Sequence, residues 1–359
     1  MNWYGEEEKI SAFEAISRAQ KLAYAPMVFQ ASRLLCELNI LKSIEDAGNQ
    51  GLTLSEITSA TGLTDYGVDV LLSMGLSAGL VYKSDQHFII TKTGHFLLND
   101  EMTRVNMAFT HDVCYQAMFY LEQAVKEGKP AGLKVFGDWN TVYEGLSQLP
   151  EQAQKSWFEF DHFYSDGAFP DALKIVFGDP PATLFDVGGN TGKWSLACAR
   201  YNPDVKITIL DLPGQLAMAE KNIMAAGFQD RVNGYTINLL DDTQPFPGKA
   251  DAIWMSQFLD CFSEQQIVNI LKRASTAMHS GSYLYIMETL WDKQNFEASS
   301  YSLNATSLYF TAVANGNSRM YAEQPFINLI QRAGLKIVDQ TDGLGFCHTL
   351  FKCQLAGSE

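Results

Sequence analysis

The sequence predicts an α/β fold in which a mainly parallel sheet with crossover helices follows an N-terminal all-helical domain of the winged-helix type. From Thr183 onward, short apolar runs alternate with helix-like runs, which is typical of parallel strands joined by helices. Upstream of that point, apolar residues recur mostly at helical spacing. With 359 residues, the chain is too long for one ordinary core and suits two packed domains.

Composition and charge exclude several classes of protein. The chain is 47% hydrophobic and 19% charged, which is typical of a globular protein. Its net charge of −15 opposes binding to phosphate backbones, so we expect no nucleic-acid partner. The six cysteines form no C-x-x-C pair and have no histidine at metal-ligand spacing, so we expect reduced thiols and no metal site. An acidic N-terminus and the lack of an apolar run of about 18 residues favour a cytoplasmic protein without a membrane partner.

The first segment, residues 10–41, has apolar residues at helical spacing. Pro26 interrupts the pattern, so we expect two helices. Their apolar content is high for surface helices. Packing against a second subunit and packing within the same subunit both remain open.

Residues 51–94 have the pattern of a helix-turn-helix followed by a wing. Thr53 or Ser55 is expected to cap the first helix and Thr64 or Asp65 the second, and residues 84–86 are expected to form a turn between two short strands. A winged helix invites a DNA-binding hypothesis. However, residues 64–82, which contain the would-be recognition helix, include no Lys or Arg, so DNA binding is disfavoured.

The domain boundaries follow from these patterns. We expect a winged-helix dimerisation domain over residues 1–100, a helical connector over 101–177 and an α/β domain over 178–359. The connector is rich in aromatic residues, which either form core or line a ligand cleft between the domains. At the C-terminal end, the run 349–354 is expected to be an antiparallel edge strand.

The strongest local signal is DVGGNTGKWS, residues 186–195, which follows an apolar strand and opens a helix. Glycines there let a ligand approach the backbone, and the helix N-terminus offers free amide groups. Asn190 stands where a dinucleotide fingerprint needs its second key glycine, so that fingerprint fails. The spacing Asp186-x-Gly188-x-x-x-Gly192 instead suits S-adenosylmethionine, although a glycine-rich turn without a ligand is the alternative.

Asp211 ends the next expected strand. A carboxylate at that position can accept hydrogen bonds from both ribose hydroxyls of a nucleoside cofactor. A turn or helix-capping role is the alternative, because Leu212-Pro213-Gly214 follows it.

Taken together, the motifs resemble those of the S-adenosylmethionine-dependent O-methyltransferases of the caffeic-acid and hydroxyindole type, including bacterial polyketide relatives. The resemblance rests on the winged-helix region up to Gly94 and on DVGGNTG, ILDLP, GFQDRV, ADAIWMSQFLDCFSE, IMETL and GNSRMYAEQPFINLIQRAGL, in this order. It implies a Rossmann-like sheet that binds S-adenosyl-L-methionine and a homodimer whose N-terminal helices intertwine.

The resemblance also implies which residues contact the cofactor. They are Asp186, Gly188, Gly189, Asn190, Gly192, Asp211, Leu212, Asn238, Leu239 and Ser256. Asn190 and Asn238 stand where the family usually has Gly and Asp. Both side chains can still hydrogen-bond, so cofactor binding should survive.

The catalytic positions depart further from the family. The family base is a His in a Leu-His-Asp-Trp type motif, and the same stretch here is Leu259-Asp260-Cys261-Phe262. Glu288 matches one carboxylate that orients that His, whereas Ser318 replaces the second. Burial beside Glu288 would raise the pKa of Asp260 toward a useful range, so Asp260 is expected to act as base or substrate anchor. A turn or capping role before Ser263 is the alternative.

For substrate contacts, the matching connector helix implies His162, Phe163 and Tyr164, with Met255 and Tyr309 lining the same pocket. Core packing is the alternative for Met255 and Tyr309, and a structural role is the alternative for His162.

The sequence thus predicts a methyltransferase that acts on the oxygen of a small aromatic or polyketide-like acceptor. The altered catalytic residues leave open a different accepting atom. They also motivate an alternative, a cofactor-binding sensor or scaffold that has lost the transfer chemistry.

Overall fold

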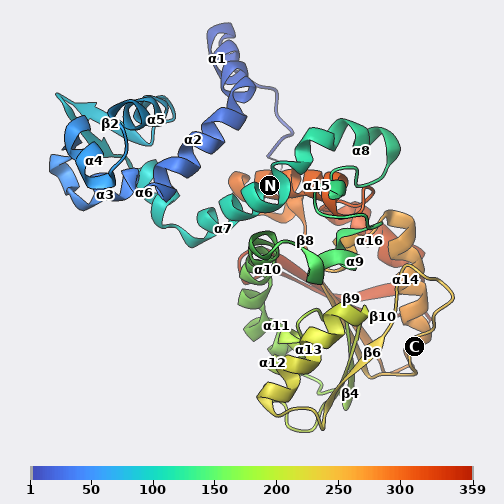
Figure 1. The fold of residues 1–359 in the computed structure, drawn as a ribbon. Coiled ribbons are helices and arrows are strands. Elements are labelled where there is room, and N and C mark those ends of the chain that lie inside the picture. Colours follow the sequence, from blue (N-terminus) through green and yellow to red (C-terminus); the bar gives the residue numbers. More distant parts are fainter. Residues whose placement is uncertain (1–2, 358–359) are drawn as a thin grey trace. The chain divides into compact units, whose positions relative to one another are not determined.

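The computed structural model describes residues 3–357 of the chain. The described chain forms two compact units (Figure 1). One runs from Glu6 to Thr110, and the other contains the remaining described residues, mainly those from His111 onward.

The N-terminal unit is helical apart from a small sheet. Its helices are α1 (Ala12–Ala23), α2 (Ala25–Glu37), α3 (Ile40–Asp46), α4 (Leu54–Thr61), α5 (Asp65–Ser77), α6 (Lys92–Asn99) and α7 (Glu101–Phe109). Pro26 lies in the first turn of α2, so the helices divide near the expected residue. Leu35, Ile44 and Leu72 are fully buried in this unit's core, whereas α1 buries no residue.

Residues 51–94 form two capped helices and a pair of short strands joined by a turn, as the sequence predicts. The Thr53 side chain caps α4, with Glu56 accepting hydrogen bonds in return, and Thr64 caps α5. The three short strands β1 (Leu52–Thr53), β2 (Val81–Ser84) and β3 (His87–Ile90) pair antiparallel in the order β1-β3-β2.

The second unit contains a seven-stranded sheet in the order β6-β5-β4-β7-β8-β10-β9. Its strands are β4 (Thr183–Val187), β5 (Lys206–Asp211), β6 (Val232–Thr236), β7 (Ala252–Ser256), β8 (Tyr283–Thr289), β9 (Leu335–Leu344) and β10 (His348–Leu355). The strands from β6 to β8 pair in parallel, so their carboxyl ends meet at one edge.

The last strand differs from the expectation in one respect. β10 is antiparallel, as predicted, but it lies between β8 and β9 and is not an edge strand. The burial of the two strands explains this order, since β10 starts with four buried residues, whereas most of β9 is partly or fully exposed. The chain turns back at Gly345 and inserts its more apolar strand next to β8.

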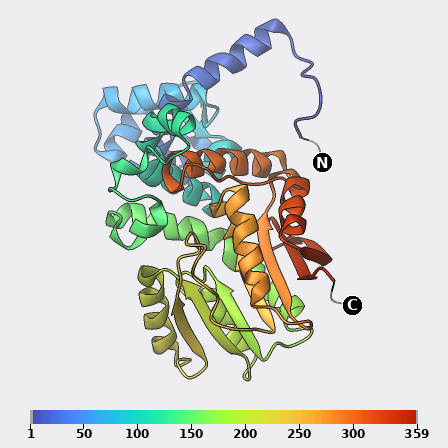
Figure 2. The same cartoon turned by 90° about the vertical axis from the view of Figure 1, so that its right-hand side faces the viewer.

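Helices cover both faces of the sheet (Figure 2). They are α12 (Lys193–Tyr201), α13 (Pro213–Ala226), α14 (Glu264–Thr276) and α16 (Glu323–Arg332), with α8 (Leu121–Glu127), α9 (Val142–Gly145), α10 (Glu151–Ser165), α11 (Phe169–Val176) and α15 (Glu297–Tyr309) also in this unit. One hydrophobic cluster packs α14 and α16 against the sheet. On the other face, the rings of Trp194 and Trp254 stack at 4.0 Å within the cluster of α11, α12 and α13. None of the described helices is long and apolar enough to cross a membrane.

Candidate active site

The glycine-rich loop follows β4 at the carboxyl edge of the sheet. Gly188 and Gly192 have φ angles of 71° and 79°, in the left-handed region that favours glycine. A Cβ atom on Gly188 would lie 2.2 Å from the ring of Phe258. Gly188 is therefore required both for its backbone angle and for the close approach of that ring.

Asp186 supports this loop from the buried end of β4. Its side chain accepts a hydrogen bond from the Ser195 hydroxyl at 2.6 Å, which ties the strand to α12. The residue is 2% exposed, and burial raises the pKa of its carboxyl group to about 7. A Cβ atom on Gly189 would lie 2.8 Å from the same carboxylate, so the loop is packed directly onto it.

Asp211 lies beside the loop, at the end of the neighbouring strand β5. One carboxylate oxygen accepts the main-chain N–H of Asn190 at 2.8 Å, and the other accepts that of Leu212 at 2.7 Å. Burial raises the pKa of Asp211 to about 6. The structure thus joins Asp211 by a hydrogen bond to Asn190 of the glycine-rich loop, although the sequence predicted the two motifs separately.

Unpaired polar atoms gather at the same edge. Asn190 Oδ1, Ser256 Oγ and Gln257 Oε1 are buried without a hydrogen-bond partner among the described residues. Since buried polar groups are normally paired, such atoms indicate a polar ligand. Together with the glycine loop and Asp211, they fit the amino-acid and ribose groups of S-adenosylmethionine.

Asn238 and Leu239 follow β6 in a turn that closes on itself. The Asn238 side chain accepts the N–H of Leu240 at 2.9 Å, and its main-chain N–H donates to Gln244 Oε1 at 2.8 Å. Leu239 is 7% exposed, and its carbonyl oxygen accepts a hydrogen bond from Arg273 at 3.0 Å. The Asn238 side chain is therefore used to hold the turn.

Asp260 and Glu288 form a buried carboxyl pair, from the short 3-10 helix Leu259–Cys261 and from β8. They are 4% and 1% exposed. Burial, together with the negative charge of Asp161, raises the pKa of Asp260 to about 7. Burial and the charge of Asp260 raise the pKa of Glu288 well above its ordinary value. Both carboxyl groups therefore keep their protons to a higher pH than exposed carboxyl groups do.

Asp161, which the sequence reasoning missed as a site residue, is the third carboxyl group. It projects from α10, and its Oδ2 accepts a hydrogen bond from the Asn190 amide at 3.2 Å. Burial raises its pKa as well. Helical spacing was the available signal, since Trp157 and Asp161 are four residues apart and share a face of the helix.

Aromatic side chains surround these carboxyl groups. Trp157 Nε1 donates to the hydroxyl of Tyr309 at 2.7 Å, and Tyr309 is 4% exposed. The buried hydroxyl of Tyr143, on α9, lies near the Cys261 thiol. Burial and the nearby Cys261 thiol raise the pKa of Tyr143 well above its ordinary value. Tyr143 and Cys261 are further residues that motif reasoning did not identify.

The three predicted residues of α10 point to different neighbours. His162 Nε2 lies 3.4 Å from the Thr191 hydroxyl, so its ring faces the glycine loop. Phe163 stacks on Phe346, in the turn between β9 and β10, at 5.4 Å. The ring of Tyr164 packs edge-on against that of Phe163 at 5.3 Å. Of the three, His162 is therefore the residue placed against the loop by a described contact.

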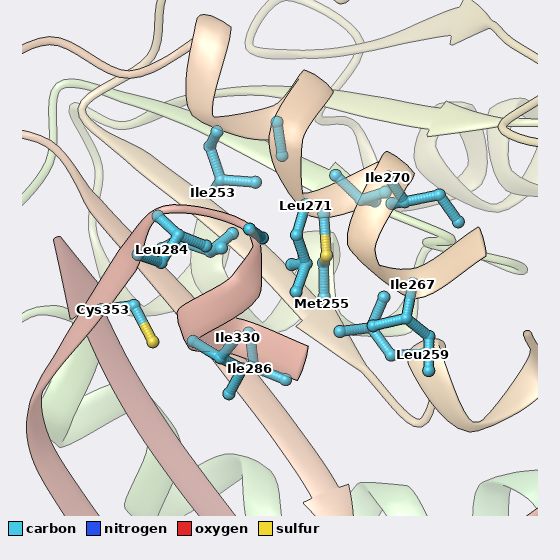
Figure 3. Close-up of a cluster of buried hydrophobic side chains, with 14 of the residues drawn as sticks. Ile253, Met255, Leu259, Ile267, Ile270, Leu271, Leu284, Ile286, Ile330 and Cys353 are labelled. Carbon is cyan, nitrogen blue, oxygen red and sulfur yellow. The ribbon is translucent and has the colours of Figure 1, made fainter. Parts of the chain in front are cut away.

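Met255 occupies the hydrophobic core. Its side chain is fully buried and lies among Ile267, Leu271 and Ile286 between the sheet and α14 (Figure 3). This position favours the core-packing alternative, because such a side chain has no surface left to contact an acceptor. The apolar residues flanking it in β7 gave the same signal in the sequence.

Ser318, which replaces the second family carboxylate, supports the Asp260 turn indirectly. Its hydroxyl donates to Asn315 Oδ1 at 2.9 Å, and the Asn315 amide donates to the carbonyl oxygen of Cys261. Ser318 is 4% exposed. Neutral hydrogen bonds therefore occupy the place where the resemblance implied a second charge.

Two family models match the chain. The O-methyltransferase domain matches residues 119–336, and the Dimerisation2-like domain matches residues 17–88. The first of these covers more than half of the chain and includes both the cofactor loop and the carboxyl pair.

Known proteins resemble the chain over nearly its whole length. An L-tyrosine C(3)-methyltransferase from Streptomyces lavendulae is 24% identical over 87% of this chain and 85% of its own. A bacteriochlorophyllide d C-20 methyltransferase from Chlorobaculum tepidum is 22% identical over 85% of this chain and 89% of its own. The crystal structure of an O-methyltransferase from neocarzinostatin biosynthesis, with S-adenosylhomocysteine and 1,4-dihydroxy-2-naphthoic acid, superimposes with a TM-score of 0.70 at 19% identity. That superposition covers 97% of this chain and 100% of the other.

Proposed function

This chain belongs to the O-methyltransferase family, and we propose that Asp260 is the base through which it methylates a small aromatic hydroxyl compound. The chain is an S-adenosylmethionine-dependent methyltransferase. The relatives described above are all methyltransferases, so the comparisons give no support to a sensor or scaffold that has lost the transfer chemistry.

The observation that carries the proposal is the buried Asp260 with its pKa of about 7. A general base works best when its pKa is near the operating pH, and an exposed Asp, with a pKa near 3.9, is too weak for a phenol of pKa ~10. Burial brings the carboxyl group into the range in which the family's histidine operates. We infer that Asp260 takes the proton of the acceptor hydroxyl.

The cofactor side of the reaction is assigned to the carboxyl edge of the sheet. Bound S-adenosylmethionine supplies an electrophilic methyl group, whose carbon–sulfur bond breaks as the acceptor attacks, leaving S-adenosylhomocysteine. We propose that Gly188, Asn190, Asp211 and Ser256 hold it, on the evidence of the glycine cradle and the unpaired polar atoms. His162 lies against the loop and contributes to the same wall. By holding both molecules in one site, these residues would position the acceptor hydroxyl next to the methyl group, so that no diffusive encounter is needed.

Glu288 positions the base rather than acting on the acceptor. Its Oε1 accepts the main-chain N–H groups of Phe258 and Leu259, at 3.1 and 2.7 Å, which fixes the turn that carries Asp260. Asn315 fixes the other end of the turn through Cys261. Asp260 is thus held from both sides.

A second candidate reaction is methylation of a ring carbon of the same acceptor. Two relatives that cover most of the chain are named as methylating carbon, and the family's histidine is replaced here. A phenolate is nucleophilic at its ortho and para carbons as well as at oxygen. Removal of the hydroxyl proton by Asp260 serves both reactions. After attack at carbon, the ring carbon loses its proton to solvent and Asp260 returns its proton to the oxygen, which restores the phenol.

We propose further that the protein is a homodimer formed through its N-terminal unit. The match to the Dimerisation2-like domain supports this. So do the apolar side chains of α1, of which Phe13 is 86% exposed and Leu22 72% exposed. Side chains of this kind on one helix are typical of a surface that another chain covers.

The experiment incubates the protein with S-adenosylmethionine and a panel of phenols, and measures S-adenosylhomocysteine release. NMR of the product then separates an O-methyl group from a ring methyl group. Turnover that falls at least about 100-fold in Asp260→Asn, but not in the exposed-residue control Asp230→Asn, supports the proposal. Full activity of Asp260→Asn would remove Asp260 from the mechanism.

A further inference from the structure

The acceptor site contains three carboxyl groups, from segments far apart in the sequence. We infer that the acceptor carries a protonated amine that Asp161 holds, so that the substrates are hydroxylated aromatic amines or amino acids. This inference rests on the proposed methyltransferase function and names the substrate class of the same site.

The three groups influence one another through space. The charge of Asp161 contributes to the raised pKa of Asp260, and the charge of Asp260 contributes to that of Glu288. Neighbouring like charges oppose ionisation unless a cation lies among them. The arrangement therefore favours a positively charged occupant.

The protein itself provides few positive charges to balance these carboxyl groups. Lys193 donates to Asp166 Oδ2 at 2.6 Å, and His162 Nδ1 lies closer to Asp166, at 3.7 Å, than to Asp161, at 3.9 Å. The contacts with Lys193 and His162 lower the pKa of Asp166 despite its partial burial, whereas burial raises the pKa of Asp161 in spite of the same two neighbours. Within residues 3–357, no Lys or Arg forms an ion pair with Asp161, Asp260 or Glu288.

An unpaired atom in the same cluster points independently to a ligand or a proton. Glu288 is 1% exposed, yet its Oε2 has no hydrogen-bond partner among the described residues. A buried polar atom without a partner is costly, so a polar group is expected to reach this cluster in the occupied site.

Asp161 is the most exposed of the three carboxyl groups. Its side chain is 26% exposed, whereas Asp260 and Glu288 are 4% and 1% exposed. The Asn190 amide binds only its Oδ2, so Oδ1 remains available to an ammonium group. Trp157 and Tyr309 lie beside it and offer aromatic surface for the acceptor ring and for the methylene groups next to a cation. The surroundings thus suit an aromatic ring and an amine together.

The test compares ligands that share a ring and differ in charge. They are tyramine and its meta isomer, the neutral ethylphenols and the hydroxyphenylpropionates, each titrated into the protein saturated with S-adenosylhomocysteine. We expect at least one amine to bind about 10 to 100-fold more tightly than the neutral compound of the same ring pattern, since hydrogen bonds to charged groups have that strength. The acids should bind more weakly than both.

Matched variants assign the effect to one carboxyl group. Asp161→Asn removes the charge and keeps an oxygen for the Asn190 amide. It should reduce the amine-to-neutral affinity ratio about tenfold or more, with little change in the affinity for S-adenosylhomocysteine. Asp166→Asn, which lies nearby on the same connector but pairs with Lys193, should leave that ratio unchanged.

Two results would overturn the inference. One is equal affinity of the amines and the neutral phenols in the wild-type protein. The other is an Asp161→Asn variant that keeps the ratio but loses affinity for S-adenosylmethionine relative to S-adenosylhomocysteine, which would assign Asp161 to the cofactor's sulfonium. Failure of the underlying methyltransferase function is distinct, because it would appear as a loss of cofactor binding in the wild-type protein.

Discussion

Glu288 Oε1 accepts the main-chain N–H of Leu259 at 2.7 Å, so a buried carboxyl group on β8 holds the residue immediately before Asp260. Both residues are at most 1% exposed. A carboxylate buried at this depth is costly unless its oxygens are bonded. The bond therefore joins the stability of the turn to the position of the base.

Replacement of Glu288 tests this relationship. Glu288→Gln keeps an oxygen that can accept the two main-chain N–H groups, so we expect turnover within about tenfold of the wild type. Glu288→Ala leaves both N–H groups buried and unpaired, at a cost of about 1–3 kcal/mol each in unfolding free energy. We expect turnover to fall about 100-fold as Asp260 loses its position. Denaturant unfolding and steady-state kinetics measure the two effects, and equal behaviour of the two variants would contradict the role.

Gly188 offers a second test, at the cofactor loop. A Cβ atom there would lie 2.2 Å from the ring of Phe258 in a backbone with φ 71°, so Gly188→Ala must displace the ring or the loop. We expect the affinity for S-adenosylmethionine to fall at least about tenfold.

Gly227→Ala is its matched control. Gly227 has a similar φ of 76°, but no atom lies within 4 Å of the added Cβ. It should cost only the backbone strain of about 1–2 kcal/mol in stability, with cofactor affinity unchanged. Calorimetric titration of both variants measures this, and similar losses of affinity would show that the close approach to Phe258 is unimportant.

Asp161 should tune the base. Its negative charge contributes to the raised pKa of Asp260, so Asp161→Asn should move the acidic limb of the rate profile to lower pH. The measurement is kcat/KM against pH for a neutral phenol, chosen so that loss of an amine contact does not interfere. An acidic limb that stays in place, or moves to higher pH, would show that the two carboxyl groups do not interact.

Asp260 should also make stability depend on pH. Its pKa is about 7 in the folded protein and near 3.9 when unfolded, so only the folded state keeps the proton between these values. Stability is therefore lost as pH rises from about 4 to 7. Asp260→Asn removes the loss, and we expect a gain of up to about 4 kcal/mol at pH 8 and almost none near pH 4. Thermal unfolding at both pH values measures it; an equal gain at both would contradict the linkage.

Much of the architecture could be predicted from local patterns. The alternation from Thr183 gave the parallel strands, and the capping residues Thr53 and Thr64 gave the helix starts, because both signals lie in a few adjacent residues. The place of β10 could not be predicted in this way. Strand order depends on which of two C-terminal strands buries more apolar surface next to β8, and residues far apart decide that.

The site likewise contains residues that the sequence could predict and residues that it could not. The glycine loop and Asp211 are motif residues at strand ends, and the structure places Asn190 and Asp211 in contact. Asp161 and Tyr143 could not be found by motif, because their importance comes from facing Asp260 across the fold. For Met255 the sequence left pocket lining and core packing open, and its full burial favours core packing.

The central claim is that a buried aspartate replaces the family's histidine as base, and its most direct test is the pH dependence of kcat/KM. The wild-type protein should show an acidic limb with an apparent pKa of about 7, at which Asp260 loses its proton and activity rises. Asp260→Asn should lose that limb together with most of its activity, whereas Asp260→His should keep a limb in the same range. A wild-type limb near pH 4, or a limb near 7 that persists in Asp260→Asn, would contradict the account.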